Sequence, residues 1–162
     1  MKKFLVLLLF IGASLQAQTS FSEKALNDVL LTVEGVEIKV NELLDVYKGK
    51  TVFIDLWAGW CKDCIVGMPK IKKLQKQYPE VVFVFLSLDK TPEEWKKAIK
   101  KYKVSGEHYY ISSGWKGDFC SSIDLDWIPR YIVVGANGEI KLYRAIEADA
   151  PAIKTVLEIT NE

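Results

Sequence analysis

The sequence contains no long run of basic residues and no apolar run long enough to cross a bilayer. Its 162 residues include 22 Lys and Arg against 21 Asp and Glu, for a formal net charge of +1. A nearly neutral chain without a basic run gives no electrostatic reason to expect a nucleic-acid partner. The apolar stretch at residues 4–11 is far shorter than the about 20 residues of a membrane-spanning helix. We therefore expect neither nucleic-acid binding nor a stable membrane span.

The N-terminal 17 residues have the order of a secretory signal peptide. Two lysines precede the apolar stretch and small residues follow it, which is the order of a cleaved signal. The alternative is an uncleaved N-terminal anchor. Because no cysteine follows the apolar stretch, we expect no lipid anchor. Removing the two lysines changes the net charge from +1 to −1. We expect a signal peptide at 1–17, a lead-in at 18–32 and one domain at 33–162.

Cysteine is scarce, with only Cys61, Cys64 and Cys120 in the chain. An odd number excludes full internal pairing. The spacing of Cys61 and Cys64 allows a redox pair, half of a metal site or a structural disulfide. A structural disulfide across so short a loop removes little entropy from the unfolded chain. A zinc site needs two further ligands, and Cys120 and the single histidine, His108, form no second close pair. We favour the redox pair and expect no metal and no cofactor.

Apolar residues recur with strand and helix periods that alternate along the chain. The expected elements, in order, are a hairpin around Glu34-Gly35, a helix that opens on the cap Asn41 and ends near Gly49, a strand at 51–57, a helix from the cysteines to Pro79, a strand at 81–88, a helix capped by Thr91, a short strand at 108–112, a loop and helical turn at 113–122, a hairpin at Asn137-Gly138 and a closing helix at 149–160. Buried strands separated by helices indicate a parallel sheet covered on both faces, and the final hairpin adds antiparallel strands. This order predicts an α/β fold, a three-layer α/β/α sandwich with a mixed central sheet and an N-terminal β-hairpin.

The lysine-rich stretch and the third cysteine are not predicted to have a function. The lysine-rich stretch KKAIKKYK at residues 96–103 is typical of the solvated face of a helix rather than of a binding patch. Cys120 is interpreted as a small apolar residue or an incidental thiol rather than a third redox partner.

Cys61 lies where a buried strand ends and a helix begins. The unpaired N–H groups and the positive end of the helix dipole favour a thiolate at this position. We expect Cys61 at an exposed helix start, while Cys64 lies one turn further into the protein. This placement predicts that Cys61 is the nucleophile and Cys64 the resolving thiol of a thiol–disulfide couple.

Two separated motifs resemble those of the thioredoxin-like superfamily. The first is FIDLWAGWCKDC, which Pro69 follows at the spacing of the kinking proline, and the second is WIPRYIVVGANGEI with Pro129. The resemblance covers about residues 33–160 and implies a thioredoxin-like fold. With the hairpin, the signal peptide and the long stretch before Pro129, the chain is similar to the exported reductase-type branch, which includes cytochrome-c-maturation and related periplasmic proteins. It implies bacterial origin and a periplasmic location.

The resemblance also implies roles for individual residues. Pro129 corresponds to the cis-proline that packs on the active disulfide, and Ile128 to the residue whose backbone pairs with the substrate. Asp55 corresponds to the buried acid that exchanges a proton with Cys64. A carboxyl in so apolar a strand should have a raised pKa, which suits acid–base work near neutrality; the alternative is a buried acid without a task. Trp57 and Trp60 correspond to the aromatics that shield and border the site.

Two positions depart from the family pattern. The dipeptide between the cysteines is Lys62-Asp63 instead of a proline-containing pair. Lys62 favours a Cys61 thiolate and Asp63 opposes it, so the sequence does not define the reduction potential. Arg130 follows Pro129 where thioredoxin has threonine, and it is expected to add positive charge near the docking groove.

We therefore predict an exported thiol–disulfide oxidoreductase that reduces or exchanges disulfides in protein substrates. Its partners would be protein thiols or disulfides and an upstream electron donor, and we expect a monomer. One alternative is a thiol peroxidase, which needs a Pro/Thr-rich loop before the reactive cysteine; AGWC has neither residue. The other is a thioredoxin-fold binding or chaperone module without turnover, which predicts loss of a cysteine or of the proline.

Overall fold

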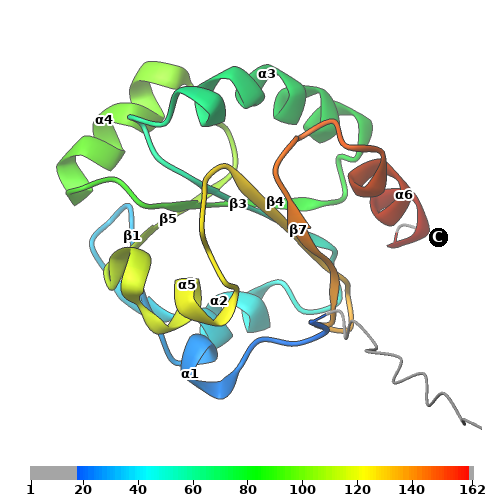
Figure 1. Cartoon of the computed structure of the whole chain (residues 1–162), viewed down its shortest axis with the longest axis horizontal. Coiled ribbons are helices and arrows are strands. Elements are labelled where there is room, and N and C mark those ends of the chain that lie inside the picture. The colour runs from blue at the N-terminus through cyan, green and yellow to red at the C-terminus, as the bar shows by residue number, and fades with distance from the viewer. Residues whose placement is uncertain (1–17, 161–162) are drawn as a thin grey trace, which may run out of the picture.

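The computed structural model describes residues 18–160, which fold around a single seven-stranded sheet (Figure 1). The expected signal peptide at 1–17 lies outside the described residues. Over the part of the chain that is described, every helix is too short or too polar to cross a membrane.

The sheet is mixed, with strand order β2-β1-β5-β4-β3-β6-β7. Its strands are β1 (Val29–Thr32), β2 (Glu37–Lys39), β3 (Val52–Trp57), β4 (Val82–Ser87), β5 (Glu107–Ile111), β6 (Arg130–Val134) and β7 (Ile140–Ala145). β3, β4 and β5 are mutually parallel, whereas β1 and β6 join them antiparallel. The two expected hairpins, β1–β2 and β6–β7, are antiparallel pairs at the two edges.

Helices cover both faces of the sheet. They are α1 (Glu23–Leu26), α2 (Val40–Val46), α3 (Lys62–Gln77), α4 (Pro92–Tyr102), the short 3-10 helix η1 (Gly114–Lys116), α5 (Asp118–Ser122) and α6 (Pro151–Thr160). Figure 1 shows α3 and α4 on one face, and α1, α2 and α5 on the other. The predicted three-layer α/β/α sandwich with a mixed sheet is therefore confirmed.

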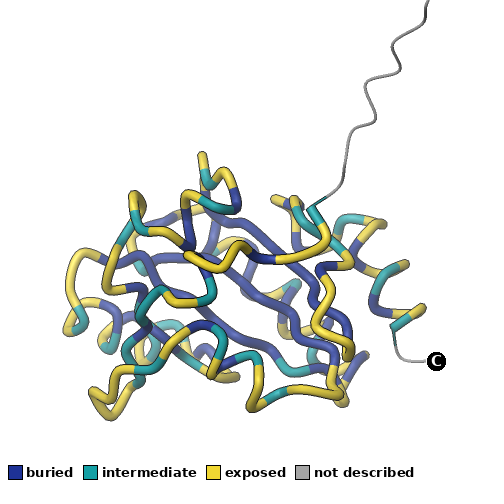
Figure 2. The backbone as a smooth tube through the Cα atoms, turned by 90° about the horizontal axis from the view of Figure 1, so that it is seen from below, coloured by how far each residue is buried: buried dark blue, intermediate teal, exposed yellow. Residues whose placement is uncertain are grey.

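The core lies along the middle strands of the sheet. All six residues of β3 and all five of β6 are buried, and the buried backbone forms the centre of the molecule in Figure 2. Burying one large aliphatic or aromatic side chain contributes about 1.5–3 kcal/mol, so these strands hold the sheet in place. Because β3 runs antiparallel to β6, the end of β3 lies beside the start of β6, with Leu56 opposite Arg130.

Local signals located some helix ends correctly and others not. The Thr91 hydroxyl accepts a hydrogen bond from the N–H of Glu94 at 3.2 Å, as its position before Pro92 predicts. The expected cap at Asn41 is wrong, because α2 begins at Val40 and its N-cap is Lys39, two residues before Asn41. The Glu42 carboxylate accepts from the N–H of Lys39 at 2.7 Å, which is the reciprocal bond of a capping box.

The stretch at 18–32, interpreted as a lead-in, contains structure of its own. It forms α1, which the sequence pattern did not reveal, and β1. β1 pairs with both β2 and β5, so the central sheet already includes residues before position 33.

Candidate active site

Cys61 and Cys64 are joined by a disulfide at the N-terminus of α3. Cys61 is the N-cap residue, and its Sγ accepts a hydrogen bond from the N–H of Cys64 at 3.1 Å. The exposed fraction is 6% for Cys61 and 1% for Cys64. Cys61 is therefore the more accessible of the two residues, but the expected exposed helix start is wrong because Cys61 is itself buried. A helix N-terminus that already donates an N–H to Sγ stabilises a thiolate at the same atom.

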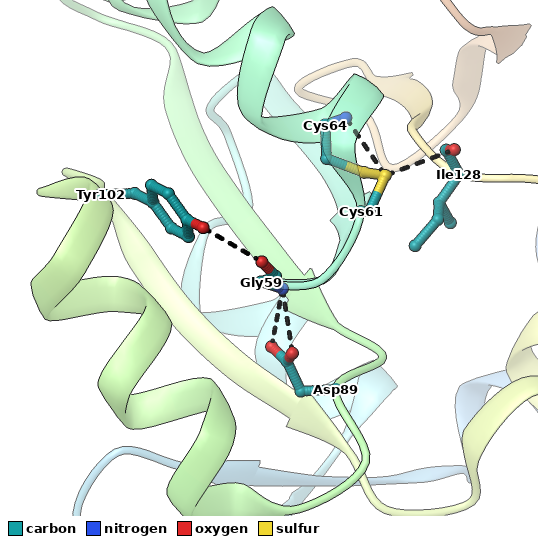
Figure 3. Close-up of a disulfide and its surroundings, with 6 residues drawn as sticks. All are labelled: Gly59, Cys61, Cys64, Asp89, Tyr102 and Ile128. Carbon is teal, nitrogen blue, oxygen red and sulfur yellow. Dashed lines mark hydrogen bonds between the residues drawn. A yellow bond between two sulfur atoms is a disulfide. The ribbon is translucent and has the colours of Figure 1, made fainter.

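The peptide segment of Ile128 and Pro129 approaches this disulfide through the Ile128 carbonyl. The peptide bond between them is cis, as the resemblance implies, and the Ile128 carbonyl oxygen is 3.6 Å from Cys61 Sγ. Figure 3 shows Ile128 beside the disulfide, approaching from the segment before β6. Trp60 is 53% exposed and directly precedes Cys61. The antiparallel pairing of β3 with β6 thus brings two segments of the sequence, almost seventy residues apart, to one small surface.

Asp55 lies in β3, beneath α3, the helix that begins at the cysteine pair. It is 1% exposed, and neither carboxyl oxygen has a hydrogen-bond partner among the described residues. Tyr131 is its cross-strand neighbour and shares its face of the sheet. The Tyr131 hydroxyl lies so close to α3 that a Cβ added to Gly67 would come within 2.8 Å of it. Asp55 therefore faces α3, the helix that carries Cys64.

The chemistry of Asp55 follows from this burial. Desolvation raises the pKa of the carboxyl well above its ordinary range, because an apolar interior disfavours the charged form. A carboxyl whose pKa is displaced toward neutrality can give or take a proton under conditions where exposed acids stay ionised. Trp57, two residues further along β3, is fully buried and lies on the same face of the strand as Asp55.

Asp89 and Tyr102 anchor the loop before Cys61, a relationship that the sequence analysis did not find. The Gly59 N–H donates to both Asp89 carboxylate oxygens at 2.9 and 3.1 Å, and the Tyr102 hydroxyl donates to the Gly59 carbonyl at 3.3 Å. Ser87 donates a further hydrogen bond to Asp89 at 2.9 Å. Figure 3 shows both side chains meeting the loop at Gly59. The available signal was an acid just after a buried strand, at the carboxyl edge of a parallel sheet where sites form.

Arg130 is placed differently from the sequence prediction. It is fully buried, so the expected positive charge at the docking groove is wrong. Its guanidinium donates to the Ile123 carbonyl at 3.2 Å and pairs with the Asp126 carboxylate, which also binds Arg144. Side chains alternate between the faces of a strand, and since Tyr131 faces α3, Arg130 points to the opposite layer.

The remaining candidates lie away from the disulfide. Cys120 is a free, fully buried thiol in α5, and burial raises its pKa to about 12. His108 is in β5, where its ring stacks on Phe85 with 5.2 Å between the ring centroids. Within residues 18–160, no three His, Cys, Asp or Glu side chains are grouped as a metal site requires.

Comparison with known proteins places the chain in a family. The family model described as thioredoxin-like matches residues 49–140, and the chain belongs to this family. A thiol–disulfide oxidoreductase ResA of Bacillus cereus is 25% identical over 129 residues, covering 78% of this chain and 70% of the relative. The ResA of Halalkalibacterium halodurans is 40% identical over 120 residues, covering 73% of this chain and 64% of the relative.

A solved structure agrees with these relatives. The crystal structure of a proposed thiol–disulfide oxidoreductase from Bacteroides vulgatus has a TM-score of 0.68 and 27% identity, covering 86% of this chain and 99% of that one. The predicted thioredoxin-like fold and the thiol–disulfide oxidoreductase class are therefore confirmed, and the chain carries the Cys61–Cys64 pair that such chemistry uses.

Proposed function

We propose that the protein is exported to the periplasm, where the Cys61–Cys64 couple reduces or exchanges disulfides in protein substrates. Cys61 attacks the substrate, Cys64 resolves the mixed disulfide, and Asp55 exchanges a proton with Cys64. The backbone of Ile128, before Pro129, and the exposed Trp60 border the surface on which the substrate docks. An upstream electron donor returns the couple to its dithiol form.

The reaction proceeds by two thiol–disulfide exchanges. The Cys61 thiolate attacks a substrate disulfide, forming a mixed disulfide and releasing one substrate thiolate, which takes up a proton. Cys64 then loses its proton to the Asp55 carboxylate and attacks Cys61 Sγ. This step forms the Cys61–Cys64 disulfide and releases the second substrate thiolate. Two electrons thus pass from the enzyme dithiol to the substrate.

One observation carries this proposal. Cys61 Sγ accepts an N–H at the start of α3 and lies 3.6 Å from the Ile128 carbonyl. The cysteine with the greater exposure therefore adjoins the backbone that would pair with a substrate strand. Cys64, with 1% exposure, is better placed to attack Cys61 than an outside disulfide. The buried Asp55 on the same side of the sheet supports its role as the proton acceptor.

The decisive experiment separates attack from resolution. The Cys64→Ser variant keeps the attacking thiol but lacks the group that releases substrate. Incubated with a disulfide-containing protein such as insulin, it should accumulate covalent complexes that a reductant dissolves. The Cys61→Ser variant should lose both turnover and trapping, and Cys120→Ser should retain full activity. Trapping by Cys61→Ser but not by Cys64→Ser would reverse the two roles.

Two further measurements test the export of the protein and the direction of electron flow. Mass spectrometry of protein recovered from the exported fraction should show a chain that lacks residues 1–17, whereas an intact N-terminus would indicate a membrane tether. The reduction potential of the Cys61–Cys64 couple distinguishes a reductant, at about −270 mV, from an oxidant, at about −120 mV.

A further inference from the structure

A hollow of about 290 Å³ opens beside the Cys61 loop. We call it the lysine hollow and define it by the residues that the argument uses, which are Gly59, Trp60, Lys90, Glu94, Lys97 and Lys101. The first two belong to the loop before Cys61, and the others belong to α4 and the turn that precedes it. The hollow is therefore continuous with the active-site loop and lies within two residues of the reactive sulfur.

The loop side of the lysine hollow is held in position by several contacts. Asp89 and Tyr102 hydrogen-bond the N–H and the carbonyl of Gly59. The loop also packs directly on α4, since a Cβ added to Gly59 would lie 2.4 Å from the Ala98 Cβ. A wall fixed in this way keeps its shape when a ligand binds, so the loop itself adds little ordering entropy.

The accessible charge in the lysine hollow is mostly positive. Lys90, Lys97 and Lys101 are exposed, and Glu94 is their exposed acidic neighbour. Asp89 also lines the hollow, but it is 6% exposed and its oxygens are occupied by Gly59 and Ser87. Between residues 18 and 160, none of these lysines takes part in an ion pair. Three lysines against one acid leave an excess of positive charge.

The lysine hollow lies where a substrate polypeptide bound across the disulfide would extend. In Figure 3, Ile128 lies on one side of the disulfide, while Tyr102 and α4 lie on the other side of the loop. A strand that pairs with Ile128 and passes over Cys61 reaches the exposed Trp60 and then the lysine hollow. Aspartate and glutamate are the substrate side chains that complement its charge, whereas a basic side chain meets three like charges.

We propose that the lysine hollow binds an acidic side chain of the protein substrate, next to the disulfide that Cys61 attacks. This inference rests on the proposed function and adds a substrate class to it, namely disulfides flanked by Asp or Glu. It also divides the lysine-rich face of α4 into two parts. Lys97 and Lys101 line the hollow, whereas Lys96 and Lys100 do not.

The test uses three disulfide-bonded peptides that differ only in the residues flanking the disulfide, which are Asp and Glu, Ser, or Lys. Wild-type kcat/KM should be about fivefold higher for the acidic than for the neutral peptide, the effect of one or two exposed ion pairs. The basic peptide should be the poorest. The Lys97→Glu/Lys101→Glu variant should lose or reverse this order, and a wild-type urea-unfolding transition would show that it is folded.

A matched control comes from the same helix. The Lys96→Glu/Lys100→Glu variant has the same spacing and the same change in net charge, and it should keep the preference for the acidic peptide. An equal loss in both variants would assign the effect to the overall charge of α4 and overturn the proposal. A wild type without preference among the peptides would also overturn it. If the wild type failed to reduce even the neutral peptide, the proposed function itself would be contradicted.

Discussion

The Gly59 N–H donates to both carboxylate oxygens of Asp89, at 2.9 and 3.1 Å. Thirty residues separate the two positions in the sequence, yet this contact holds the loop that ends in Cys61. Burial raises the pKa of Asp89, while the hydrogen bonds from Ser87 and Gly59 act in the opposite direction by stabilising the charged form. The contact therefore couples the carboxyl edge of β4 to the position of the reactive sulfur.

Removing this anchor should weaken both the fold and the exchange reaction. Hydrogen bonds to a charged group contribute about 1.5–3 kcal/mol, so Asp89→Ala should lower the free energy of unfolding in urea by about 2 kcal/mol. Disulfide exchange should slow because Cys61 is less well positioned. Asp89→Asn keeps one acceptor oxygen and should lose less of both. The exposed Asp45→Ala is the control, and an equally small loss for Asp89→Ala would show that the anchor contributes little.

Gly59 is expected to tolerate no side chain while Ala98 faces it. A Cβ at position 59 would lie 2.4 Å from the Ala98 Cβ, and such overpacking costs about 1–3 kcal/mol. Removing the opposing methyl leaves 3.3 Å as the shortest remaining distance, to Asp89 Oδ1. Gly59→Ala should thus be strongly destabilising alone and clearly less so in an Ala98→Gly background. Urea unfolding of the two single variants and the double variant measures this coupling, and strict additivity would contradict it.

Asp55 should make the stability of the oxidised protein depend on pH. Its pKa in the folded protein is raised by burial, whereas in the unfolded chain it is about 3.9. As the pH rises above the unfolded value, the unfolded chain loses this proton first, so the free energy of unfolding falls until the pH passes the folded pKa. The Asp55→Asn variant has no titrating carboxyl at this position. Its free energy of unfolding relative to wild type should therefore increase as the pH rises from the unfolded to the folded pKa of Asp55. Parallel pH profiles in urea unfolding would exclude the effect.

The same substitution should slow the resolving step. Asp55→Asn preserves the shape of the side chain but cannot accept a proton from Cys64, so exchange near neutral pH should be slower by about 10²-fold, the lower end of general acid–base contributions. Insulin reduction rates between about pH 6 and 9 test this expectation. Rates equal to wild type at every pH would show that Asp55 has no part in proton transfer.

Cys120 should be unreactive in the native protein. Burial raises its pKa to about 12, and only the thiolate is nucleophilic. In the oxidised protein Cys120 is the only free thiol, because Cys61 and Cys64 are joined. Iodoacetamide at pH 8 should add no label to the folded protein and one label after denaturation, as mass spectrometry would detect. Rapid labelling of the native protein would contradict its burial.

Much of the fold and the chemistry can be inferred from the sequence, because the responsible signals are local. The continuous apolar run of β3 and the turn residues Asn137-Gly138 depend on residues that are neighbours in the chain. The same holds for the cap at Thr91 and for the two cysteines at a helix start. Pro129 was identified from a motif rather than from its surroundings. These signals predict the layers of the sandwich and the redox pair without knowledge of tertiary contacts.

Other features depend on which surfaces meet after the chain folds. Asn41 and Lys39 both stand where a helix can begin, and the actual start depends on how α2 packs beside β2. Both faces of β6 are covered, so Arg130 is buried on either face; strand register determines which layer its guanidinium enters, and composition does not. The anchoring of Gly59 by Asp89 and Tyr102 requires β4 and α4 to lie against the Cys61 loop. Local periodicity specifies each element, but only tertiary packing brings side chains from distant elements within hydrogen-bond distance.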